Sequence, residues 1–140
     1  MKAKVSTVNQ DIEVFGSYLS DCVYDLIVAT ESLLKGANEA INNWQDEPGQ
    51  FRWIFTRQDR VVSFQIAQFE DTFSKKRNEE GKVIFEAKVN LTSFARGVVS
   101  AMDKLRNNID EEEYYRLWNY EFPSDRLKIL REVYRSRKES

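Results

Sequence analysis

Acidic side chains are the residues of this chain whose types and spacing could do chemistry. They occur in pairs at Glu70-Asp71, at Glu79-Glu80, and at Asp110 with Glu113. Two nearby carboxylates can serve a hydrolase as acid and base, or bind Mg²⁺, and neither role needs a histidine. The alternative is that these acids are solvated, or that they stabilise the start of a helix through its dipole. We favour the second interpretation, because the pairs fall in predicted loops and at a predicted helix start.

Cysteine and histidine add little further chemistry. Cys22 is the only cysteine and the chain has no histidine. The commonest base that activates a thiol and the commonest zinc ligand are therefore both missing. Cys22 also lies on the apolar side of a predicted helix, which favours a buried structural cysteine over a nucleophile. We expect a protein that is not an enzyme, with no catalytic residue, no metal site and no cofactor.

Aromatic side chains are a second candidate for binding chemistry. Those that alternate along the predicted strands are Trp44, Phe51, Trp53, Phe55, Phe64 and Phe85. Exposed aromatics beside a positive groove would stack nucleic-acid bases, but the net charge here is -2. These aromatics also share a face with Val62, Ile66 and Val83, which helices should cover. We interpret them as core and expect no nucleic-acid binding.

One alternative for the same aromatics stays open. A large apolar cavity between the sheet and the helices, lined by Trp44, Trp53 or Phe64, would indicate a domain that binds a small molecule or a peptide. Close packing at these residues would count against it. Gly97 lies inside a predicted helix, and there we expect close packing of the helix against a neighbour.

The N-terminal half is predicted to be a hairpin, a helix and a meander. Residues 1–15 have a β-like pattern with a polar break at 9–11, and residues 17–35 repeat apolar side chains at helical spacing, followed by the capping residue Gly36. Four further strands are predicted, at residues 39–45, 50–57, 60–69 and 82–89.

The register of the central hairpin follows from its turn. If Gln58-Asp59 is a two-residue turn, the apolar pairs are Phe55 with Val62, Trp53 with Phe64, and Phe51 with Ile66. A turn around Pro48-Gly49 then places Trp44 on the face of Phe51 and Trp53. In the last strand, the residues expected on the buried face are Val83, Phe85, Ala87 and Val89.

Helices are predicted to complete the chain. Asn90 is a suitable N-cap for a long helix, Asp110 with Glu113 starts a short one, and Pro123-Ser124 opens the last. The basic residues of the last helix are expected on its solvated face. The charged end at residues 135–140 is expected to fray.

We therefore predict one α+β domain over residues 1–140. Its antiparallel meander has about five or six strands, packed on one face by a long N-terminal helix and by C-terminal helices. The chain has no apolar run of membrane-spanning length and no secretory signal. We expect a cytoplasmic protein with no membrane contact.

The meander predicts where acidic residues gather. It brings the turn at residues 46–49 and the loop at residues 70–81 to the same end of the sheet, around the basic tip Lys75-Lys76-Arg77. The candidate partner-binding residues are Asp46, Glu47, Glu70, Asp71, Glu79 and Glu80. Clustered acids would speed and orient the docking of a basic partner. The alternative is a solubilising loop of mixed charge.

A resemblance to other proteins suggests what kind of partner the chain binds. The segments that carry it are Ser17-Tyr18-Leu19-Ser20-Asp21, Trp44-Gln45-Asp46-Glu47-Pro48-Gly49, Phe51-Arg52-Trp53, Phe94-Ala95-Arg96 and Phe122-Pro123. In this order the chain resembles small, uncharacterised bacterial proteins, a size class that includes many immunity proteins of polymorphic and contact-dependent inhibition toxins. The resemblance implies an immunity protein that binds a cognate toxin, for example a nuclease. A self-associating structural protein is a further alternative, and the oligomeric state stays open.

Overall fold

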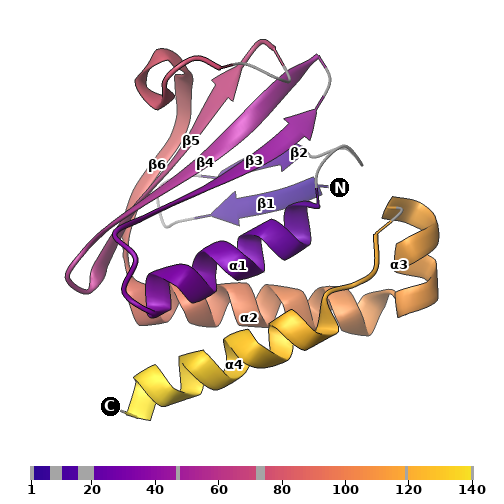
Figure 1. Cartoon of the computed structure of the whole chain (residues 1–140). Coiled ribbons are helices and arrows are strands. Elements are labelled where there is room, and N and C mark those ends of the chain that lie inside the picture. The colour runs from indigo at the N-terminus through magenta and orange to yellow at the C-terminus, as the bar shows by residue number, and fades with distance from the viewer. Residues whose placement is uncertain are drawn as a thin grey trace.

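The computed structural model describes residues 2–6, 11–15, 21–46, 48–71, 75–118 and 120–139. Figure 1 shows the helices and strands in chain order, which are β1 (Lys2–Ser6), β2 (Asp11–Phe15), α1 (Cys22–Leu34), β3 (Glu39–Asp46), β4 (Gly49–Gln58), β5 (Val61–Phe69), the 3₁₀ helix η1 (Asn78–Glu80), β6 (Lys82–Asn90), α2 (Leu91–Asn108), α3 (Glu111–Trp118) and α4 (Ser124–Glu139). The fold is α+β, as predicted.

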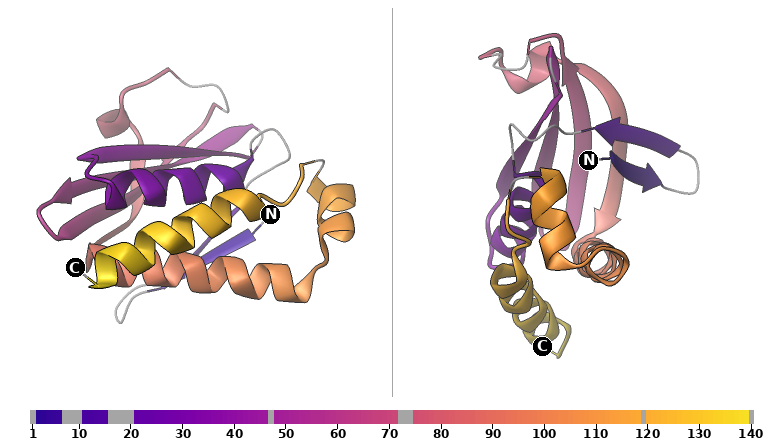
Figure 2. Two further views of the ribbon diagram at one scale, coloured as in Figure 1. Left: turned by 60° about the horizontal axis from the view of Figure 1, so that its bottom comes forward. Right: turned by 90° about the vertical axis from the view of Figure 1, so that its right-hand side faces the viewer.

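The main sheet has four antiparallel strands in the order β3-β4-β5-β6. The expectation of a sheet of five or six strands is wrong, because β1 and β2 pair with each other in a separate two-stranded sheet. The helix α1 follows β2 in the chain and packs against β3, so the first hairpin does not continue the meander. Figure 2 shows this hairpin standing apart from the main sheet.

The predicted register of the central hairpin is wrong by two residues. Gln58 pairs with Val61, so the turn is made by Asp59 and Arg60. Asp59 has a φ of +57°, and aspartate tolerates the left-handed conformation that two-residue hairpin loops need. Phe55 consequently faces Phe64, and Trp53 faces Ile66. Because the shift is even, every aromatic stays on its predicted face.

The turn between β3 and β4 has an even number of residues, as predicted, so Trp44 lies on the predicted face of the sheet. Trp44 pairs with Phe51 and Asp46 with Gly49, so the pairing has the register of a two-residue connection. Trp44 lies on the face of Trp53, as expected, and their rings stack with centroids 4.5 Å apart.

A β-bulge changes the last strand. Phe85 pairs with Ile66, but Val83 pairs with Ala67, so Ile84 is an extra residue on β6. The bulge turns Val83 to the outer face of the sheet, where it is 47% exposed. The expectation that Val83 shares the buried face is therefore wrong.

The first helix is shorter than predicted. Asp21 has a non-helical backbone and its side chain accepts a hydrogen bond from the Tyr24 N–H, so Asp21 is the N-cap and α1 has 13 residues. The expected long helix from Ser17 is therefore not present in this form, and residues 16–20 lie outside the described part. The later caps are confirmed, since Asn90 accepts from the N–H groups of Thr92 and Ser93, and Asp110 from that of Glu113.

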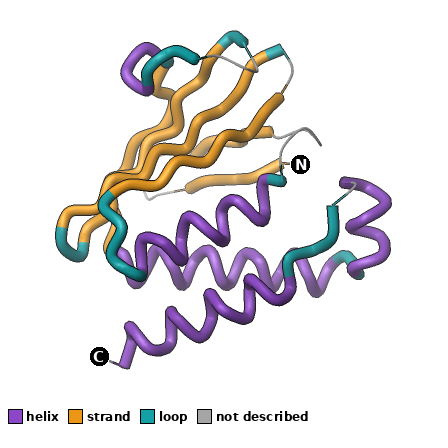
Figure 3. The backbone as a smooth tube through the Cα atoms, in the orientation of Figure 1, coloured by secondary structure: helices purple, strands orange, loops and turns teal. Residues whose placement is uncertain are grey.

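The helices form two layers on one face of the sheet. The first layer consists of α1 against β3 and α2 against β5 and β6, and α4 packs across both helices (Figures 1 and 3). Thus α4 covers helices rather than the sheet itself. It continues to Glu139 and includes most of the end expected to fray.

Ion pairs connect α4 to the first helical layer. Arg126 binds Glu31 of α1, and Arg131 binds Asp103 of α2. The expectation of a solvated basic face is wrong for these two arginines. Glu31 is only 4% exposed and also pairs with Lys35, at 2.8 Å.

Candidate functional site

The acidic end of the sheet is the first candidate. As predicted, the β3–β4 turn lies beside the segment that follows β5, because Gln50 pairs with Phe69 and its Nε2 donates to the Asp71 carbonyl at 3.4 Å. Asp46 and Glu70 line the same surface hollow, which has a volume of about 300 Å³. Three candidate residues, Asp46, Glu70 and Asp71, therefore lie at this end. Glu47 lies outside the described residues.

Glu79 and Glu80 have local partners instead. Both form ion pairs with Arg77, with nitrogen–oxygen distances of 3.6 Å. The Arg77 N–H also donates to Glu80 Oε2 at 2.8 Å. Their charges are thus met by the basic tip of their own loop, so the acidic residues do not form one continuous negative surface.

Arg52 fixes this loop against the outer face of β4, which no sequence pattern indicated. The side chain is 8% exposed, and its Nη1 donates to the Lys76 carbonyl at 2.8 Å and to Asn78 Oδ1 at 2.9 Å. The centre of its guanidinium lies 4.1 Å from the ring centroid of Phe69, and burial lowers its pKa. The loop is therefore held by a buried cation.

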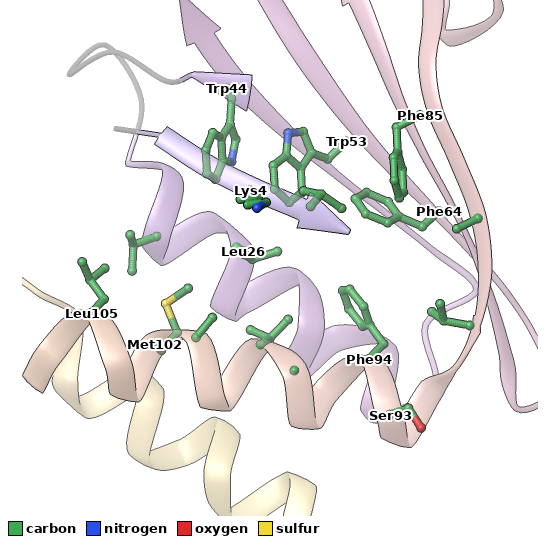
Figure 4. A pocket seen from close by; sticks show the side chains of 17 residues that line it. Lys4, Leu26, Trp44, Trp53, Phe64, Phe85, Ser93, Phe94, Met102 and Leu105 are labelled. Atoms are coloured by element: carbon green, nitrogen blue, oxygen red, sulfur yellow. The ribbon is translucent and has the colours of Figure 1, made fainter. Parts of the chain in front are cut away.

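The second candidate is a cavity of about 520 Å³ on the inner face of the sheet. The sheet contributes mainly aromatic rings to its wall, those of Trp44, Trp53, Phe64 and Phe85. The opposite wall is α2, α1 contributes Val23 and Leu26, and β1 contributes Lys4 and Val5. Figure 4 shows the aromatic wall facing α2 across this space. The volume lies within the usual range for small-molecule sites.

Small residues on α2 leave the cavity open. Ser93, Gly97 and Ala101 line it and succeed one another at four-residue steps, which places them on one side of a helix. A Cβ atom built on Gly97 would meet no atom within 4 Å. The expectation of close packing at Gly97 is therefore wrong, because this glycine faces open space.

The two stacked indoles carry buried polar atoms without partners. Trp44 and Trp53 are 2% and 4% exposed, with their ring planes 21° apart. Neither Nε1 has a hydrogen-bond partner among the residues that the structure describes, and the same holds for Nδ2 of Asn42, which pairs with Trp53 across the strands. Such atoms are rare in folded proteins, because each loses its hydration without compensation.

Acidic groups near the start of α1 are perturbed by burial. Burial raises the pKa of Asp21, although its hydrogen bond from Tyr24 opposes this. Burial and the charge of Asp21 raise the pKa of Asp25. Burial also raises the pKa of Tyr114, with the nearby Asp21 and Cys22 adding to the effect. Cys22 is 3% exposed, as expected of a structural cysteine.

Within the described ranges, no group of three or more histidine, cysteine or acidic side chains could hold a metal ion. The helices in that part of the chain are too short or too polar to cross a membrane. Comparisons of the chain with protein-family models, with curated proteins and with solved structures find no match. Functional inference therefore rests on the geometry of these two candidate sites.

Proposed function

We propose that the chain is a non-enzymatic binding protein whose inner cavity takes an apolar small molecule. The observation that carries this proposal is the cavity of about 520 Å³ between the aromatic wall of the sheet and the small residues of α2. A well-packed core has few voids larger than a water molecule. When an apolar ligand fills a space of this size with a mostly apolar lining, its transfer out of water lowers the free energy of the complex.

The choice of small molecule over peptide follows from the shape of the site. Its space of about 520 Å³ between the strands and α2 is of a size that holds one small molecule, whereas a peptide would need a longer groove or would pair with the edge strand β6.

The test is a titration with a neutral fluorescent probe such as N-phenyl-1-naphthylamine, whose emission rises in an apolar environment. Gly97→Leu should abolish the rise, because the new side chain enters the cavity where a Cβ atom meets nothing within 4 Å. Ser100→Leu is the matched control, since residue 100 is exposed on the same helix and does not line the cavity. Equal probe binding by Gly97→Leu and the unaltered chain would contradict the proposal.

A second proposal is that the chain is an immunity protein that binds a cognate toxin through its acidic end. It is supported by the common hollow that Asp46 and Glu70 line. The test mixes the protein with a toxin domain encoded beside its gene. Asp46→Lys with Glu70→Lys should weaken the complex, whereas Glu39→Lys, at the opposite end of β3, should not. Absence of a complex at micromolar concentrations would refute this proposal.

A further inference from the structure

We infer that the ligand of the inner cavity is a single-chain amphiphile, whose unbranched alkyl tail lies along α2 while its polar head stays in water. The inference rests on the proposed binding function and adds the shape and the chemical class of the ligand. Three properties of the cavity carry it, which are its elongated form, the aliphatic side chains near its surface, and its opening along one side of α2.

The cavity is long and narrow. Its lining on α2 runs from Ser93 to Leu105, and Figure 4 shows Phe94, Met102 and Leu105 in succession along this helix. At a helical rise of about 1.5 Å per residue this lining extends about 18 Å, whereas a sphere of the same volume, about 520 Å³, would be only about 10 Å across. A ligand that fills the cavity is therefore elongated rather than compact.

The part of the lining that a ligand can reach is mainly aliphatic. The aromatic rings of the sheet are only 2% to 5% exposed, so they form the floor of the cavity and offer little free surface. The half-buried residues of the lining are Val5, Ala87, Val89, Phe94 and Leu105. Contact with such side chains favours an alkyl tail, because both surfaces leave water together.

The cavity opens to solvent beside α2. Ser93, Gly97 and Ala101 line it and are exposed, so this side of the helix forms its rim. A tail can enter across this rim and leave its polar head outside, where the head keeps its hydration. Burial of the head against the apolar lining would instead cost free energy. The cavity therefore suits an amphiphile that is only partly buried.

The length of the cavity determines the length of the tail. An extended alkyl chain advances about 1.3 Å per carbon, given C–C bonds of about 1.5 Å, so about 14 carbons match the lining on α2. Ala101→Leu would obstruct the cavity part of the way along. Between residues 93 and 101 about 12 Å remain, which is enough for about nine carbons.

The test titrates octyl, decyl, dodecyl and tetradecyl maltoside, each below its micelle-forming concentration, by displacement of N-phenyl-1-naphthylamine. For the unaltered chain the affinity should rise about four-fold per methylene group through the whole series. For Ala101→Leu the rise should stop near decyl maltoside, so tetradecyl maltoside should bind about 100-fold more weakly than to the unaltered chain, or weaker still. Octyl maltoside should bind both proteins equally. Ser100→Leu is the matched control and should behave like the unaltered chain.

The outcomes separate this inference from the binding function itself. If the affinity does not depend on tail length, or if Ala101→Leu changes the binding of all four maltosides equally or not at all, the tail along α2 is overturned while the apolar site stands. Binding only above the micelle-forming concentration would also overturn the inference, because the protein would then recognise a micelle surface. If neither the maltosides nor N-phenyl-1-naphthylamine bind, the proposed function fails together with the inference.

Discussion

Two glycines show how the surroundings of one residue decide the effect of the same substitution. A Cβ atom on Gly49 would lie 2.5 Å from the Phe69 carbonyl oxygen, part of the backbone of a paired strand. A Cβ atom on Gly97 would meet nothing within 4 Å. The first glycine permits close strand approach, and the second leaves space in the cavity.

Gly49→Ala should therefore lower the free energy of unfolding by about 1 to 3 kcal/mol, because neither strand can move away without losing pairing. Gly97→Ala should raise it by up to about 1 kcal/mol, since alanine favours the helix. Urea denaturation of both variants checks this. An equal effect of the two substitutions would contradict the packing described for them.

At the scale of elements, the sequence predicted best what depends on neighbouring residues. The strands, the caps at Asn90 and Asp110, and the shared face of Trp44 and Trp53 follow from alternation, side-chain capping and parity. The sequence predicts the turn at Gln58-Asp59, one residue earlier than the observed turn at Asp59 and Arg60, because aspartate suits several turn positions. The bulge at Ile84 could not be predicted, because the residues around it still alternate as they do in a regular strand.

The contacts between elements were harder to predict. Glu31 and Arg126 are 95 residues apart in the chain, and a basic helix face gives no sign of which arginine turns inward. The cavity was equally hard to predict, because a glycine within a helix is compatible both with close packing and with open space. The wall aromatics could be identified from the sequence, but the space in front of them could not.

The ion pair between α1 and α4 should contribute measurably to stability. The Glu31 side chain is 5% exposed, and Arg126→Met would leave its carboxylate with Lys35 alone. We expect the free energy of unfolding to fall by about 1 to 3 kcal/mol. Arg135→Met, at an exposed position of the same helix, should change it by less than about 0.5 kcal/mol.

A double-mutant cycle with Glu31→Gln separates the ion pair from the loss of the arginine itself. Groups in direct contact usually show a coupling free energy of about 0.5 to 3 kcal/mol. Additive effects of the two substitutions would mean that Arg126 acts only through its packing.

The stability of the whole molecule should depend on pH through the start of α1. Burial and the charge of Asp21 raise the pKa of Asp25 above its ordinary value of 3.8. The native state then binds this proton more tightly than the unfolded state does, so ionisation destabilises the fold. The penalty is absent below pH 3.8, grows as the pH rises through the folded-state pKa, and is complete above it.

Asp25→Asn should therefore raise the free energy of unfolding at neutral pH and have little effect near about pH 3, where both states of the unaltered chain are protonated. Thermal unfolding of both proteins across this range measures the difference. A stabilisation that stays constant with pH would show that the carboxylate charge is not its cause.

The whole molecule is organised around the space between its sheet and α2. The aromatic wall, the small residues of α2 and the side chains of β1 come from distant parts of the chain and line one cavity. The proposed binding function requires that an apolar ligand occupies this cavity.

The most direct measurement is the set of intermolecular nuclear Overhauser effects between unlabelled decanoate and the methyl groups of the ¹³C-labelled protein. We expect cross-peaks from the ligand chain to Ala101, Met102 and Leu105, which line the cavity. Cross-peaks confined to methyl groups such as those of Ile41, which is 42% exposed and does not line the cavity, would contradict the account.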